Sequence, residues 1–178
     1  MAANTDNMLW QHRKLAAGEL ARDFSVTAQT FGDTFVQYVT GPPDSESSSV
    51  IELRRRESCA LTWAAIEATF IASPLTEEER DKVVPLVREA LLPYWRKYRV
   101  DTEDFITRVR ERSAAYLRHQ SPMSQLKTAT GFMNELMANL DPDAVRLLPQ
   151  RTLIAMLAHR MLSDLRRLNE VKSSHTIV

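Results

Sequence analysis

The stretch FSVTAQTFGDTFVQYVTG, residues 24 to 41, decides whether this chain of 178 residues is purely helical or also contains a hairpin. Its β-branched and aromatic residues, with Gly32 in the middle, are compatible with a small hairpin over residues 24–40. Alternation with a period of two is poor, however, and large apolar residues recur at helical spacing, at Leu20, Phe24, Phe31, Phe35 and Tyr38. We therefore expect a helix, and keep the hairpin as the alternative.

This first helix has no clear stop signal before Gly41. We expect it to run from a cap at Thr5 or Asp6 to about Thr40, with Gly32 as a place where it could bend. More than thirty residues at about 1.5 Å each would reach roughly 50 Å. Because that length exceeds the diameter of a small domain, we expect part of the helix to lie against a second subunit.

Helix signals continue through the rest of the chain, and the whole sequence holds only four glycines. Thr76 and Glu79 have the spacing of a capping box, and Ser121-Pro122 and Asp141-Pro142 each pair a cap residue with proline at the first helical position. Apolar residues at steps of three and four follow these caps. Five methionines occupy or adjoin the resulting stripes, so we assign them to the core: 123, 133, 137, 156 and 161.

These patterns predict an all-α protein of a single domain, residues 1–178, built as a mostly antiparallel bundle of about six helices with a long N-terminal helix. Val50 to Ala72 is apolar nearly all round, as expected of a central helix, and Glu67 within it needs a partner. GPPDSESSS, residues 41–49, is predicted to be a flexible loop, and residues 173–178 a frayed tail.

Charge is unevenly divided although the net charge is zero. Residues 1–79 carry 6 basic and 12 acidic groups, whereas residues 80–178 carry 17 basic and 11 acidic groups. The two halves are therefore expected to attract each other, within one subunit or between two. Cys59, the only cysteine, cannot form an intramolecular disulfide, and no signal peptide or membrane span is visible, so we expect a soluble, cytoplasmic protein.

The densest group of aromatic and basic side chains is PYWRKYR, residues 93–99. On a helix, its tyrosines project toward the core, while a second flank combines tryptophan with arginines, the composition of interface hot spots. We therefore predict a partner-binding surface formed by Arg88, Trp95, Arg96 and Arg99. Acidic residues follow at once, which makes a nucleic-acid groove a weaker interpretation.

No metal or cofactor site is expected, because the four histidines lack ligand neighbours at helical spacing and no two glycines are adjacent. One enzymatic pattern is present. Arg112 and His119, in RSAAYLRH, resemble the Arg-x4-6-His motif of the HEPN family. That resemblance implies an all-α, often dimeric, metal-independent ribonuclease in which these two residues act on the scissile phosphate. Ser113 departs from the family's pattern, because a different polar residue commonly follows the arginine.

The sequence favours a non-enzymatic protein that binds other protein surfaces and pairs with itself as a homodimer. The HEPN-like ribonuclease and a helical nucleic-acid-binding module are the alternatives. A small-molecule pocket beneath Trp63 and Phe70 also stays open, because apolar cavities leave little trace in a sequence.

Overall fold

The computed structural model describes residues 13–40, 48–96 and 102–178. Within these ranges the chain forms seven helices and two short strands, in the order β1 (Arg13–Leu15), α1 (Ala17–Thr40), α2 (Ser48–Ala72), α3 (Glu77–Arg96), α4 (Thr102–Leu117), α5 (Gln125–Asn139), α6 (Pro142–Leu147), α7 (Gln150–Ser174) and β2 (His175–Ile177). The predicted all-α fold is confirmed, including its long first helix. The alternative hairpin over residues 24–40 is wrong, because α1 runs without interruption through Gly32.

Helix α1 begins later than predicted. A strand occupies Arg13–Leu15, so the helix starts at Ala17 instead of Thr5 or Asp6, which themselves lie outside the described residues. Twenty-four residues span roughly 36 Å at 1.5 Å per residue. A helix of that length fits along a single domain, and the argument for a second subunit from its length therefore no longer holds.

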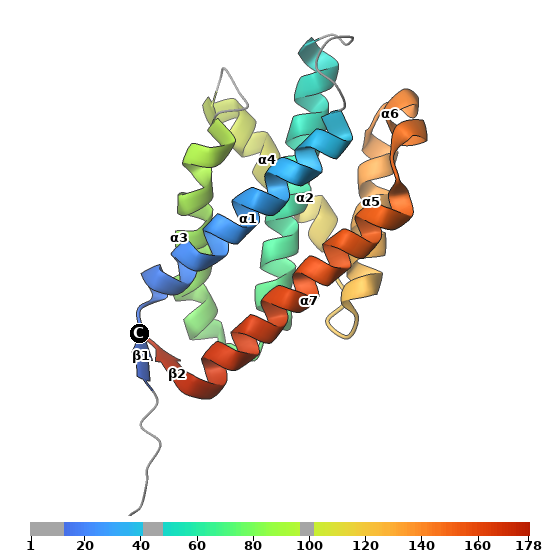
Figure 1. Ribbon diagram of the computed structural model, residues 1–178. Coiled ribbons are helices and arrows are strands. Elements are labelled where there is room, and N and C mark those ends of the chain that lie inside the picture. The colour runs from blue at the N-terminus through green and yellow to red at the C-terminus, as the bar shows by residue number, and fades with distance from the viewer. Residues whose placement is uncertain (1–12, 41–47, 97–101) are drawn as a thin grey trace, which may run out of the picture.

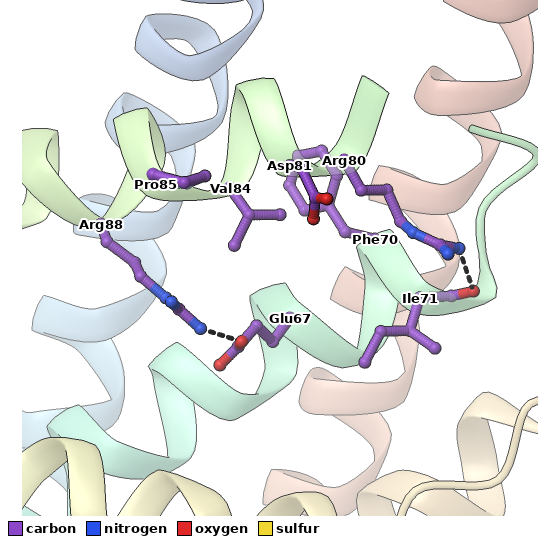
Figure 2. A pocket seen from close by; sticks show the side chains of 8 residues that line it. All are labelled: Glu67, Phe70, Ile71, Arg80, Asp81, Val84, Pro85 and Arg88. Carbon is purple, nitrogen blue, oxygen red and sulfur yellow. Dashed lines mark hydrogen bonds and ion pairs between the residues drawn. The ribbon is translucent and has the colours of Figure 1, made fainter. Parts of the chain in front are cut away.

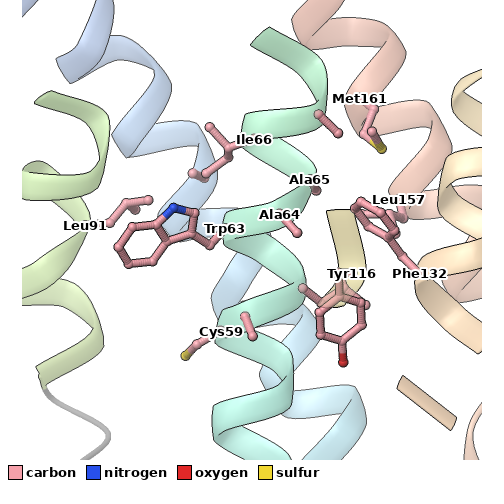
Figure 3. Close-up of a cluster of buried hydrophobic side chains, with 14 of the residues drawn as sticks. Cys59, Trp63, Ala64, Ala65, Ile66, Leu91, Tyr116, Phe132, Leu157 and Met161 are labelled. Carbon is pink, nitrogen blue, oxygen red and sulfur yellow. The ribbon is translucent and has the colours of Figure 1, made fainter. Parts of the chain in front are cut away.

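Helix α2 lies at the centre of the bundle and contacts α1, α3, α4, α5 and α7 (Figure 1). Its side chains are buried on several sides, with Trp63 facing α3 and small alanines such as Ala64 and Ala65 facing the other helices (Figure 3). Tyr116 of α4 and Phe132 of α5 pack edge to face within the same core, with their ring centroids 5.8 Å apart. Alanine lets neighbouring helix axes approach closely, so the expectation of a central buried helix is confirmed.

The C-terminal residues are not a frayed tail. Strand β2 pairs in parallel with β1, with Arg13 opposite His175 and Leu15 opposite Ile177 (Figure 1). The amide of Ala17 also donates to the carbonyl of Val178 at 3.0 Å, and Ile177 is buried. The prediction failed because the pairing partner of these residues lies at the other end of the chain. Of the predicted loop over residues 41–49, Ser48 and Ser49 belong to α2 and the remainder lies outside the described residues.

Ion pairs join the acidic first half to the basic second half within one subunit. Four of them follow the predicted polarity: Asp23–Arg167, Glu57–Arg112, Glu67–Arg88 and Glu79–Lys172. A fifth, between Arg54 and Asp141, has the opposite polarity. The charge imbalance between the halves is thus used inside the domain, and it no longer argues for a dimer. In the described ranges, no helix combines the length and apolar character needed to cross a bilayer.

Candidate functional site

The predicted partner-binding surface does not form as expected, because Trp95 is 0% exposed. Val83, Val87, Leu91 and Trp95 are all buried and follow one another at steps of four along α3. The expectation that the tyrosines occupy this face and that tryptophan lies at the surface is wrong for Trp95. The step of four was the signal that could have placed it correctly. The side chain of Arg96 and the whole of Arg99 lie outside the described part of the chain.

Trp95 packs on Trp63 of α2, with their ring centroids 4.8 Å apart. Trp63 in turn contacts two arginines that are partly or largely exposed to solvent. Arg88 of α3 and Arg110 of α4 lie over the ring of Trp63, with their Cζ atoms 5.4 Å and 6.0 Å from its centroid. Both contacts are cation–π interactions, which hold a flexible guanidinium group in place. Three helices therefore bring two arginines to one indole ring.

A cavity of about 250 Å³ opens beside this ring. It is lined by Trp63, Glu67, Arg88, Arg110, Ser113, Ala114 and Leu117. A second cavity of about 200 Å³ lies between α2 and α3 (Figure 2). Glu67 and Arg88 line both cavities and form an ion pair with each other. The expected partner of Glu67 is therefore Arg88. Trp63 lines the first cavity and Phe70 lines the second, so the two residues do not share one of these cavities.

Burial raises the pKa of Glu67, against the opposing effect of Arg88. The ion pair with Arg88 only partly offsets the desolvation of this carboxylate. The Nε atom of Arg88 is also buried, and it has no hydrogen-bond partner among the described residues. At the wall between the two cavities, the Glu67 carboxylate is therefore not fully compensated for its loss of water, and the Arg88 Nε–H lacks an acceptor in the described ranges.

The two residues of the HEPN-like motif meet at one carboxylate. Arg112 donates from Nη2 to Glu135 at 3.0 Å, and Nε2 of His119 lies 3.2 Å from the second oxygen of Glu135. Arg112 also forms a bidentate pair with Glu57, donating from Nε and Nη2 at 2.8–3.0 Å. The Tyr116 hydroxyl donates to Glu57 at 2.8 Å. The sequence placed Arg112 and His119 on one face, but it gave no sign of the two carboxylates.

The electrostatics of this network are those of a closed structural cluster. Burial raises the pKa of Tyr116, and the neighbouring Glu57 carboxylate adds to the effect. For Glu135, burial acts to raise the pKa, but the hydrogen bonds from Arg112 and His119 outweigh it and the net pKa is lowered. Arg56 also pairs with Glu57, with its Nε atom 3.7 Å from the carboxylate, so the two carboxylates of the cluster face two guanidinium groups.

A patch of apolar side chains is exposed at α5, α7 and the turn before α5, and it includes Met123, which was expected in the core. Met123 is 94% exposed, Leu126 59% and Leu162 43%. These three residues, which we call the apolar patch, line a groove of about 340 Å³ between α5 and α7, together with Pro122 and Leu165.

The prediction for Met123 is wrong because no helix starts at Ser121-Pro122. The actual N-cap is Ser124, whose side chain accepts from the amide of Lys127, so Met123 lies in the preceding turn. Of the other four methionines expected in the core, Met133 and Met161 are buried and Met137 is partly buried, while Met156 is partly buried and packs against the core.

No group of three potential metal ligands occurs among the residues that the structure describes. The sequence matches no known protein family, and no curated protein and no solved structure shows significant similarity to the chain. Functional inference therefore rests on the geometry of the arginine-lined cavities, the Glu57–Arg112 network and the apolar patch.

Proposed function

We propose that this protein acts by binding protein surfaces without catalysis, and that its apolar patch pairs two copies as a homodimer. The observation that supports this most directly is the exposure of Met123, Leu126 and Leu162 in one contiguous region. Contiguous exposed apolar side chains at the rim of a groove are typical of protein-interaction sites. A reducing, cytoplasmic setting is part of the proposal and fits the single, buried Cys59.

A second copy is the occupant that the shape of the patch favours. Met123 protrudes from a turn directly beside the groove lined by Leu126, Leu162 and Leu165. In the proposed dimer a two-fold axis places the Met123 side chain of each copy against the groove of the other. Overall net charge is zero, so two copies do not repel each other through long-range electrostatics.

The dimer is expected to be weak. Fully burying one leucine or methionine contributes about 1.5–3 kcal/mol, while association costs roughly 4–15 kcal/mol. Six such side chains, three from each copy, contribute at most about 9–18 kcal/mol, and a net association free energy of about 5.5–7 kcal/mol lies within the difference between the two ranges. We expect a dissociation constant on the order of 10–100 μM.

Sedimentation equilibrium checks this proposal through a matched pair of variants. Leu126→Glu is expected to abolish dimerisation, because it places a charge at the centre of the patch, whereas Val26→Glu on α1 leaves it unchanged. The two wild-type side chains are similarly exposed, 59% and 57%. Raising the salt concentration to 1 M should not dissociate the dimer, because the contact is apolar. A wild-type protein that stays monomeric at several hundred micromolar, or a Leu126→Glu protein that still dimerises, contradicts the proposal.

The ribonuclease alternative is supported by one observation, the meeting of Arg112 and His119 at Glu135. Its electrostatics are unfavourable, since Glu57 and Glu135 already occupy the guanidinium group that would have to contact a phosphate. A nucleic-acid-binding module has a similar difficulty, because four basic groups of the second half are already paired with acidic residues of the first: Arg88, Arg112, Arg167 and Lys172.

We therefore expect no cleavage when the protein is incubated with RNA in the presence of a chelator. His119→Ala is the informative variant, because the His119 side chain is exposed and its loss leaves the Glu57–Arg112 pair intact. RNA cleavage by the wild type that disappears in His119→Ala would replace the interaction proposal with the enzymatic one. Salt-sensitive binding of RNA or duplex DNA without cleavage would favour the nucleic-acid-binding module instead.

A further inference from the structure

The cavity beside Trp63 contains positive charge that the carboxylates around it do not fully neutralise. Glu67 pairs with Arg88. Arg110, by contrast, is exposed and forms no ion pair within the described residues, where its contact is with the Trp63 ring. Together these three ionisable groups carry a net charge of +1 at the cavity.

The same cavity has apolar walls. Ala114 and Leu117 of α4 line it together with Trp63. Ligand pockets typically combine apolar surface with a few polar groups that fix the orientation of the ligand. A guanidinium group matches a carboxylate through two parallel N–H···O hydrogen bonds, and it binds this group better than a lysine does.

The arginines are held in place before any ligand arrives. Both guanidinium groups lie over one indole ring, and Arg88 is further fixed by Glu67. Side chains that are already ordered lose less conformational entropy when a ligand binds. The Nε–H of Arg88, which has no acceptor among the described residues, is a further donor left unused in the ligand-free protein.

We propose that this cavity binds a small organic monocarboxylate with an aromatic or similarly apolar body, whose carboxylate contacts the guanidinium groups of Arg88 and Arg110. The volume of about 250 Å³ is below the range of about 300–1,000 Å³ typical for drug-sized ligands, which limits the ligand to a body of about one ring. Glu67 contributes one negative charge at the cavity wall and so disfavours dianions such as hydrogen phosphate. The apolar body lies against Ala114 and Leu117.

Isothermal titration calorimetry with three probes tests this site: benzoate, its neutral analogue benzamide, and inorganic phosphate. Benzoate is expected to bind saturably with a dissociation constant on the order of 1 mM, while benzamide and phosphate bind at least about tenfold more weakly. Arg110→Gln is expected to weaken benzoate binding by about tenfold or more, because it removes the unpaired cation. Arg108→Gln is the matched control, since Arg108 lies on the same helix, pairs with Asp104 and does not line the cavity.

A second variant tests the apolar wall separately from charge. Ala114→Leu fills the cavity at an exposed position and should also abolish benzoate binding while leaving the protein folded. The proposal is overturned if the folded wild type shows no saturable benzoate binding, if benzamide or phosphate binds equally well, or if Arg110→Gln and Arg108→Gln behave alike. Leu126→Glu should retain benzoate binding, so the failure of this site and the failure of the dimer are distinguishable.

Discussion

Replacing Arg112 with methionine is expected to lower the free energy of unfolding by about 3–5 kcal/mol, the usual cost of removing one partner of a buried ion pair. Glu57 is only 1% exposed, and Arg112 supplies two of the N–H groups that its carboxylate accepts. Without Arg112, this buried carboxylate accepts only from the Tyr116 hydroxyl among the described residues, and the Arg56 Nε atom at 3.7 Å is too distant to replace the lost hydrogen bonds. Urea denaturation followed by circular dichroism measures the change.

Arg108→Met provides the control for this prediction. Arg108 lies one turn earlier on α4 and pairs with Asp104, both half-exposed to solvent. An exposed pair of this kind contributes about 0.3–0.5 kcal/mol, so Arg108→Met should leave the midpoint nearly unchanged. Equal effects of Arg108→Met and Arg112→Met would show that Glu57 is hydrated or compensated by other groups.

The double variant Glu57→Leu with Arg112→Met separates two quantities: the net contribution of the ion pair to stability, and the cost of leaving one of its charges buried without the other. Because both charges are removed together, no carboxylate is left at the buried position of Glu57, while Glu135 keeps its contacts with His119 and Asn139. We therefore expect most of the lost stability to return. A double variant as unstable as Arg112→Met alone would mean that the apolar replacements do not pack at this position. An Arg112 variant can therefore lose function through loss of stability, without the loss of a catalytic group.

Trp95→Ala is expected to cost about 3–5 kcal/mol, as large-to-small substitutions of buried aromatic residues do. The ring is fully buried and packs on Trp63 at 4.8 Å. Its removal leaves a cavity beneath the indole that carries Arg88 and Arg110. A thermal or urea unfolding curve tests the expectation directly, and an unchanged midpoint would restore the interpretation of Trp95 as a surface residue.

Trp95→Phe refines the prediction. The indole Nε1–H of Trp95 has no hydrogen-bond acceptor among the described residues. Trp95→Phe therefore loses packing area but no hydrogen bond. We expect its decrease in the free energy of unfolding to be less than half of that caused by Trp95→Ala. Tyr38→Ala, at an aromatic residue that is half-exposed, serves as the control and should cost well under 1 kcal/mol.

Local signals in the sequence were sufficient for most of the helices. The reciprocal bonds of the Thr76–Glu79 capping box are present, with the Thr76 amide donating to Glu79 at 2.8 Å and the Glu79 amide to the Thr76 hydroxyl at 3.3 Å. Asp141 caps α6 with Pro142 at the first position, as expected. These features depend on residues three or four apart, and a single sequence contains that information completely.

The candidate sites were less predictable because they depend on how far each apolar stripe is covered. Leu126 and Leu162 continue the stripes of α5 and α7, yet no neighbouring helix covers them. The periodicity of a stripe shows which side of a helix is apolar. How many residues of that side are buried depends on where the neighbouring helix ends. The prediction for Trp95 is wrong for a different reason, because the two adjacent aromatic residues Tyr94 and Trp95 both fit a helical pattern, and only the step of four from Val83 through Leu91 distinguishes Trp95.

By itself the sequence determined that this protein is helical, that α2 is its centre, and that its acidic half attracts its basic half. Only the tertiary structure decided that this attraction is satisfied within one subunit, that β1 and β2 join the two ends of the described chain, and that Arg88 and Arg110 meet over Trp63. Helix formation follows from contacts between near neighbours along the chain. Which carboxylate meets which guanidinium group, and which apolar residue stays uncovered, follows from the packing of helices that are far apart in sequence.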